Sequence, residues 1–307
     1  MSFIWYSNEA GHDHLTPPGH PEQVARHEAV ERALSPMGLD RRVASPCTDD
    51  DLLLGHPQDY IDRVIRSAPT NGRVQLDGDT HMSPGTLEAV RCGVGGCIAA
   101  VDAVLGGEAK SAFVGTRPPG HHAEKQTAMG FCVFNNVAIA ARHALDRHGL
   151  DRVAVLDFDV HHGNGTQDIL WDEGRAAFVS SHQMPLYPGS GRAGERGAHG
   201  QITNLPLAPG SGGREMRAAW EGALEGVRDF APGLLILSAG FDAHADDPLA
   251  GLDWDVEDFE WITTAICDLA DAVCGGRIVS NLEGGYDLDA LAASAAAHVE
   301  ILRERSA

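Results

Sequence analysis

The stretch that decides the fold runs from Val153 to Gln167 and reads VAVLDFDVHHGNGTQ. Its apolar, β-branched beginning is typical of a strand buried in a parallel sheet, and its glycines predict a turn into a helix. The alternation of side chains along a strand points Asp157, Asp159 and His161 to one side. Carboxylate oxygen and imidazole nitrogen both suit zinc or manganese, so the stretch predicts half of a metal site.

The bulk composition narrows the class of protein. The chain has 307 residues, of which 43% are hydrophobic and 22% charged, as is ordinary for a soluble globular protein with a large core. Its net charge of −21 argues against nucleic acid or an anionic membrane as the main partner, since both would be repelled. A negative net charge would suit a cationic substrate, but it is also explained by solubility alone.

The cysteines and the absence of targeting segments indicate the compartment. The six cysteines form no C-x-x-C pair, and no secretory signal or membrane span is visible. We therefore expect reduced thiols and a cytoplasmic location.

Strand-like and helix-like segments alternate along the chain. Further strands are predicted at 3–7, 111–115, 177–180, 234–242 and 277–280, and helices at 21–34, 56–67, 84–105, 135–148, 213–230 and 256–273, with an Ala-rich helix at the end. With no linker or break in composition, this pattern predicts one α/β domain over residues 1–307 with a mainly parallel sheet. The clusters of polar residues come directly after strands, and open parallel sheets bind their ligands at the carboxyl ends of the strands.

The second half of the metal site is expected at the end of the strand at 234–242, which is Asp242. Together with Asp159 and His161 it would supply three protein ligands, the number that leaves a catalytic zinc with an open position. The alternative is that Asp242 caps the next segment and that His161 is an ordinary buried imidazole.

Two adjacent histidines, His121 and His122, follow a rigid Pro-Pro-Gly turn at a strand end. They are candidates for a general base and an electrostatic partner, with Asp157 as the acceptor for His121 and Asn164 for His122. A pair that only caps the turn is the alternative. Tyr286, on a Gly-Gly turn, could donate a hydrogen bond to a developing oxyanion, although such a tyrosine is more often a packing residue.

Five motifs in order resemble the zinc-dependent histone deacetylase superfamily. The resemblance is to its class II and bacterial branch, with histone deacetylase-like amidohydrolases, acetylpolyamine amidohydrolases and acetoin-utilisation proteins. The motifs are RPPGHHA at 117–123, GFCxxNN at 130–136, DxDxHHGNGT at 157–166, GFDAH at 240–244 and EGGY at 283–286. The similarity extends from His20 to Tyr286.

The resemblance implies a three-layer α/β/α arginase-deacetylase fold around a mainly parallel eight-stranded sheet. It assigns one zinc per chain to Asp159, His161 and Asp242. It gives general acid and base work to His122, an electrostatic role to His121 and carbonyl polarisation to Tyr286, while Asp157 and Asn164 orient the two histidines.

The resemblance also assigns the surroundings of the site. Phe131 and Tyr187 would line a tunnel for an acyl-lysine-like chain, Asp79 would bind a substrate amide at its rim, and Gly285 would also contact substrate. A structural potassium ion is expected beside Asp157, Asp159 and Ser180, and Arg26 would border a channel for acetate.

The implied activity is hydrolysis of a linear acetyl amide, which releases acetate from acetyl-lysine or from a small acetylated amine or polyamine. Leu249 stands where the eukaryotic polyamine deacetylase has a glutamate, which weakens the polyamine assignment. Gly163 and His244 stand where two-manganese ureohydrolases carry acidic residues, which favours a single metal. A weak or inactive member that binds acylated ligands or partners is the alternative function, and a homo-oligomer is left open.

Overall fold

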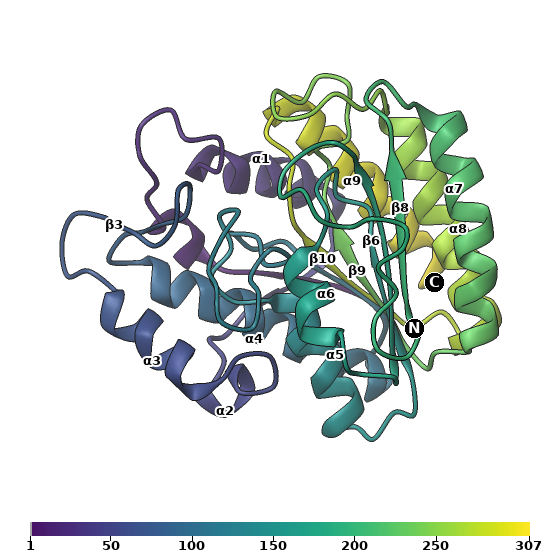
Figure 1. Ribbon diagram of the computed structural model, residues 1–307, viewed down its shortest axis with the longest axis horizontal. Helices are drawn as coiled ribbons and strands as arrows, with labels where there is room; N and C mark the ends of the chain where they lie inside the picture. Colours follow the sequence, from purple (N-terminus) through teal and green to yellow (C-terminus); the bar gives the residue numbers. More distant parts are fainter. Residues whose placement is uncertain (1) are drawn as a thin grey trace.

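A central sheet of eight parallel strands organises the protein (Figure 1). The structure is a computed structural model that describes residues 2–307. The strand order is β2-β1-β5-β10-β9-β6-β7-β8. The strands are β1 (Ser2–Ser7), β2 (Asp40–Val43), β5 (Ala109–Val114), β6 (Val153–Asp157), β7 (Ala176–Gln183), β8 (Ile202–Leu207), β9 (Leu235–Ala239) and β10 (Ile278–Leu282). A small antiparallel pair, β3 (Val74–Gln75) and β4 (His81–Met82), lies outside this sheet.

Helices cover both faces of the sheet. One face packs against α1 (Val24–Leu34), α7 (Gly213–Phe230), α8 (Val256–Cys274) and α9 (Leu288–Arg305), and the other against α4 (Thr86–Leu105), α5 (Asn136–Asp146) and α6 (Asn164–Leu170). Two further helices, α2 (Asp49–Leu52) and α3 (Gln58–Ser67), lie beside α4 and α5 (Figure 1). The expected three-layer α/β/α fold with an eight-stranded, mainly parallel sheet is confirmed.

The central strand β6 shows why this sequence forms a buried strand. Ala154 and Leu156 enter the core on the α7–α8 side, whereas Val153 and Val155 enter the core on the α4–α5 side. A strand covered on both faces needs apolar residues at successive positions, as this one has. The strand ends at Asp157, earlier than the alternation through His161 predicted, because the backbone bends at residues 159–161.

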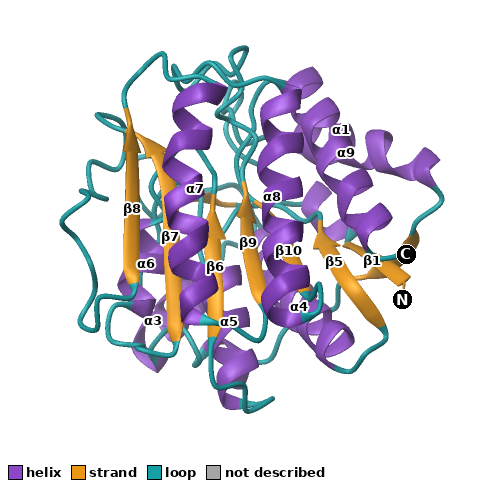
Figure 2. Cartoon of the chain, turned by 90° about the vertical axis from the view of Figure 1, so that its right-hand side faces the viewer, coloured by secondary structure: helices purple, strands orange, loops and turns teal. Residues whose placement is uncertain are grey.

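The carboxyl ends of the parallel strands lie at one edge of the sheet, where the long loops gather (Figure 2). The predicted site residues 121–122, 157–164, 242 and 286 lie at or after the carboxyl ends of strands and therefore meet at this edge. Among the described residues, no helix is both long enough and apolar enough to cross a membrane.

Candidate active site

Three side chains that the sequence predicts as metal ligands converge at the ends of two neighbouring strands. Asp159 and His161 follow β6, and Asp242 follows β9, which pairs with β6 in the sheet. The Nδ1 atom of His161 lies 3.1 Å from Asp159 Oδ1 and 3.1 Å from Asp242 Oδ2. One ligand atom from each residue lies within 4.8 Å of the others, and all three residues are buried. The structure thus brings these three side chains together, and their role as metal ligands stays a prediction.

The chemistry of this group fits a divalent cation such as zinc. Burial raises the pKa of Asp242, and the nearby carboxylate of Asp159 raises it further. Burial would lower the pKa of His161, but its hydrogen bonds with Asp159 and Asp242 raise it to about 10. A proton on His161 thus balances two buried carboxylates, and a cation at the same point would balance them better. Two carboxylates and one imidazole are a donor set that zinc accepts.

The two adjacent histidines have different acceptors. Nδ1 of His121 lies 3.0 Å from Asp157 Oδ2, whereas Nδ1 of His122 lies 2.7 Å from Asn164 Oδ1. Burial would lower the pKa of His121, but the carboxylates of Asp159 and Asp157 raise it to about 10. Burial, together with the charges of His121 and His161, lowers the pKa of His122 well below its usual range. Because the pKa values of the two histidines are shifted in opposite directions, the two groups suit distinct acid–base roles.

Tyr286 projects from the turn after β10 towards the same site. Burial raises its pKa well above the usual range, so the phenol stays protonated. Its ring lies 5.8 Å from that of Phe131, and the Arg26 guanidinium lies 4.8 Å from its centre. Its backbone N–H donates to Asp247 Oδ2 at 2.7 Å, which fixes the turn.

A cavity of about 230 Å³ opens onto these groups. Phe131 and Tyr187 form aromatic walls, and the Tyr187 ring lies 5.3 Å from that of His122. Its lining residues are Asp79, His122, Gly130, Phe131, His161, Leu186, Tyr187, Leu249 and Tyr286. The structure thus brings together the predicted tunnel residues, the rim residue Asp79 and the predicted base in one cavity.

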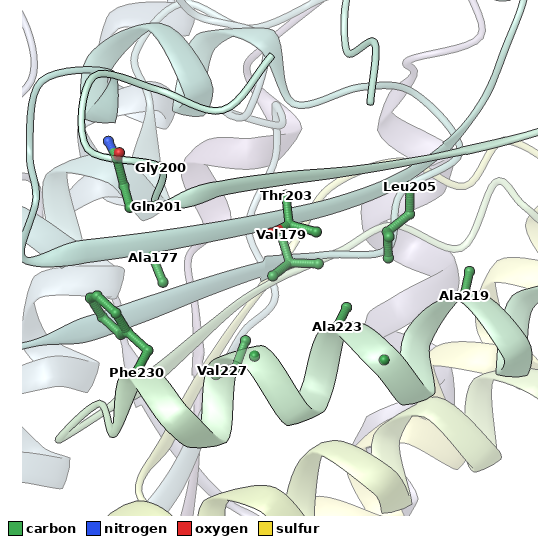
Figure 3. Close-up of a pocket in the computed structure, with 12 residues that line it drawn as sticks. Ala177, Val179, Gly200, Gln201, Thr203, Leu205, Ala219, Ala223, Val227 and Phe230 are labelled. Atoms are coloured by element: carbon green, nitrogen blue, oxygen red, sulfur yellow. The ribbon is translucent and has the colours of Figure 1, made fainter. Parts of the chain in front are cut away.

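A larger cavity, of about 430 Å³, lies between α7 and the strands β7 and β8 (Figure 3). Its wall consists of small and apolar residues together with Gln201 and Thr203, and none of its lining residues is ionisable. It therefore lacks groups that could act as acid, base or metal ligand, and the chemistry is expected in the smaller cavity.

Arg26 and Gly285 lie behind the cavity and are not part of its wall. Arg26 donates from Nε to the Gly285 carbonyl at 2.6 Å, from Nη2 to the Glu283 carbonyl at 2.6 Å, and from Nη1 to Glu22 Oε1 at 3.2 Å. The guanidinium is thus already satisfied by the protein. The substrate role of Gly285 and the acetate role of Arg26 stay predictions.

The residues expected to hold potassium are adjacent in the sheet. Asp157 and Ser180 are direct partners in the β6–β7 ladder. Ser180 Oγ lies 3.0 Å from His182 Nδ1, and Asp157 Oδ1 accepts from the Asp159 backbone N–H at 3.1 Å. The potassium site stays a prediction.

Two supporting carboxylates had no role in the sequence analysis. Glu283 Oε2 accepts from the backbone N–H groups of Gly120 at 2.7 Å and His121 at 3.1 Å, and so holds the histidine turn. Asp247 holds the turn of Tyr286 in the same manner. Glu283 lies inside the EGGY motif, where a charged residue between an apolar strand and two glycines was the available signal, and Asp247 lies three residues after the GFDAH motif, beside Asp246 and Pro248.

Comparison with known proteins agrees with this fold and these motifs. Residues 20–302 match the family model described as the histone deacetylase domain. A histone deacetylase-like amidohydrolase of Pseudomonas aeruginosa is 41% identical over 277 residues, which cover 87% of this chain and 73% of that protein. A "Probable deacetylase" of Methanothermobacter thermautotrophicus is 39% identical over 287 residues, which cover 90% of this chain and 83% of that protein. The crystal structure of the HDA15 HD domain has a TM-score of 0.94 at 31% identity, over 99% of this chain and 89% of that chain.

The sheet and the motifs at its carboxyl edge thus define a protein of the deacetylase and amidohydrolase class. More particularly, the chain belongs to the histone deacetylase family, as the resemblance predicted.

Proposed function

We propose that the protein hydrolyses an acetyl amide and releases acetate from an acetylated amine, with one zinc ion held by Asp159, His161 and Asp242. The observation that carries this proposal is the convergence of His122, His161 and Tyr286 on one cavity with aromatic walls. A bound zinc ion would supply Lewis-acid polarisation of the amide carbonyl and would lower the pKa of a nearby water.

The chain's own residues would carry the proton transfers. His122 is neutral, because its pKa is lowered, and its Nδ1 is engaged by Asn164, so its Nε2 is the atom free to accept a proton. Nε2 would take the proton from the attacking water and then deliver it to the leaving amine. His121, held by Asp157, would place positive charge beside this step.

Tyr286 would stabilise the negative charge that develops on the carbonyl oxygen. Its phenol is protonated because burial raises its pKa, and within the described part of the chain its hydroxyl has no hydrogen-bond partner. A donor that is free in the resting protein can be aimed at the oxyanion.

The cavity also supports a substrate class. Phe131 and Tyr187 would pack against an unbranched methylene chain, as in acetyl-lysine or an acetylated diamine. Asp79 at the rim would accept a hydrogen bond from the substrate, and Leu249 supplies an apolar contact where a glutamate would select a second amine. We therefore favour acetyl-lysine or a simple acetylated amine over a polyamine.

The test is acetate release by the wild-type protein and by Tyr286→Phe, with an acetyl-lysine peptide and acetylputrescine as substrates. We expect Tyr286→Phe to lower kcat by about 10²–10³-fold through the loss of one oxyanion donor. Its stability should change little, since the hydroxyl is unpaired. Tyr6→Phe is the matched control, because the Tyr6 hydroxyl donates to the Ala99 carbonyl far from the cavity and its loss should leave kcat unchanged. Unchanged turnover in Tyr286→Phe would refute the proposed mechanism.

A further inference from the structure

A carboxylate lies behind the acceptor of His122. Asn164 Oδ1 faces His122 Nδ1 at 2.7 Å, and on the other side Asn164 Nδ2 donates to Glu124 Oε1 at 2.8 Å. Glu124 is half-buried and, among the described residues, takes part in no ion pair. Its side chain is therefore committed to the Asn164 amide.

Glu124 determines which way the amide of Asn164 is turned. An ionised carboxylate accepts hydrogen bonds and cannot donate them, so it must face the NH₂ end of the amide. In the opposite orientation Oδ1 would face Oε1 of Glu124, and two oxygens with no hydrogen between them repel. Two weaker acceptors lie near the same nitrogen, Met129 Sδ at 3.3 Å and the His122 carbonyl oxygen at 3.5 Å, and both are consistent with the observed orientation.

The orientation of the amide in turn determines the tautomer of His122. An amide oxygen facing Nδ1 requires the imidazole proton to be on Nδ1, which leaves Nε2 with a free lone pair. A turned amide would offer an N–H group to Nδ1 and would drive the proton to Nε2. The base would then be protonated at the atom that has to accept a proton.

The neighbouring histidine shows what a direct carboxylate does. Asp157 contacts His121 itself, whereas Glu124 is separated from His122 by one amide. The Asn164 amide, which lies between Glu124 and His122, fixes the orientation of the imidazole. It also passes on part of the negative potential of Glu124, but it forms no ion pair with His122. This arrangement lets two adjacent imidazoles keep different protonation states.

We propose that Glu124 is a positioning residue that acts through Asn164 and holds His122 as the Nδ1–H tautomer. This inference rests on the proposed function for its kinetic consequence, although the tautomer itself is a property of the resting protein. Glu124 also lies close enough to Tyr187 for its charge to raise that pKa, so a role as a charge at the cavity mouth is the competing explanation. A mouth charge would act on KM for cationic substrates, whereas a positioning residue acts on kcat for every substrate.

The kinetic test combines substitutions at both positions, with an uncharged acetyl-lysine peptide and a cationic one. Glu124→Gln should lower kcat by about 10–100-fold for both peptides, as is usual when a residue that orients a histidine is lost, with KM nearly unchanged. In the Asn164→Asp background the effect should reverse. There the carboxylate introduced at position 164 would repel Glu124, so adding Glu124→Gln should raise kcat. A purely structural role, or a charge at the mouth, predicts no reversal.

A second measurement does not depend on turnover. The ¹⁵N shifts of the His122 ring, assigned with His122→Ala, should show the Nδ1–H tautomer in the wild-type protein and a mixture of tautomers in Glu124→Ala. Glu195→Gln is the matched control, because Glu195 Oε2 accepts from the Gln167 amide at 2.7 Å in a similar carboxylate–amide contact that does not involve His122. It should leave the ring shifts unchanged.

The outcomes separate the two proposals. A tautomer change without any acetate release would overturn the proposed function and keep the positioning role. Unchanged His122 shifts in Glu124→Ala, or a fall in kcat on Glu124→Gln in both backgrounds, would overturn the positioning role.

Discussion

A side chain at Gly163 would collide with the carboxylate that supports His121. A Cβ atom built there runs into Oδ2 of Asp157, the atom that faces His121 Nδ1, and also approaches the ring of Phe178 at 3.2 Å. In the sequence, Gly163 indicates that a ligand for a second metal is lacking. The structure adds that the position has no room for any side chain unless Asp157 moves.

We therefore predict that Gly163→Ala destabilises the protein by about 1–3 kcal/mol, the usual range for overpacking a buried site. Turnover should fall as well, because a displaced Asp157 no longer orients His121. Urea unfolding and acetate release measure the two effects. Gly222→Ala is the matched control: it lies within α7, nothing lies near the added Cβ, and it should stabilise the helix by about 0.5–1 kcal/mol. If Gly163→Ala were as stable and active as Gly222→Ala, the close packing described here would be wrong.

At the scale of elements, strongly patterned segments were predictable and edge strands were not. The helix predicted at 213–230 is α7 (Gly213–Phe230), and the one predicted at 256–273 is α8 (Val256–Cys274). The sequence pattern did not predict β2 (Asp40–Val43) or β8 (Ile202–Leu207), and the eight-stranded count came from the resemblance. Both are edge strands, which have a neighbouring strand on one side only and therefore carry more polar residues. In addition, β8 contains a proline.

The candidate site divides in the same way. Residues that directly follow apolar strands could be predicted, because parallel strands bring their carboxyl ends together. Contacts between side chains distant in sequence could not, since a pattern along the chain carries no information about them. The hydrogen bonds of Arg26 with the Gly285 carbonyl and of Glu124 with Asn164 form because the fold brings these distant residues together.

At the scale of the whole molecule, buried neutral histidines make stability depend on pH. His298 is fully buried between the hydroxyls of Thr263 and Ser280, at 2.7 and 2.8 Å, and burial lowers its pKa to about 3. The unfolded chain binds a proton at this histidine below pH 6.5, whereas the folded chain does not until about pH 3. Stability is therefore lost as pH falls through this window, by about 1.4 kcal/mol per pH unit for one histidine.

The free energy of unfolding should fall less steeply between pH 6 and pH 5 in His298→Leu than in the wild-type protein. The expected difference corresponds to one proton, about 1.4 kcal/mol per pH unit. The comparison with the wild-type protein is needed because Asp247, whose pKa burial raises to about 7, contributes with the opposite sign. Urea unfolding at a series of pH values measures both slopes. Identical slopes in the two proteins would show that His298 is not held neutral by the fold.

We propose that the activity of this protein as a deacetylase depends on one divalent metal held by Asp159, His161 and Asp242. The most direct measurement is acetate release from an acetyl-lysine peptide while metal-depleted protein is titrated with Zn²⁺. We expect no activity without metal and a rise to a plateau at one zinc per chain. Full activity in the metal-depleted protein, or a plateau reached only at two ions per chain, would contradict it.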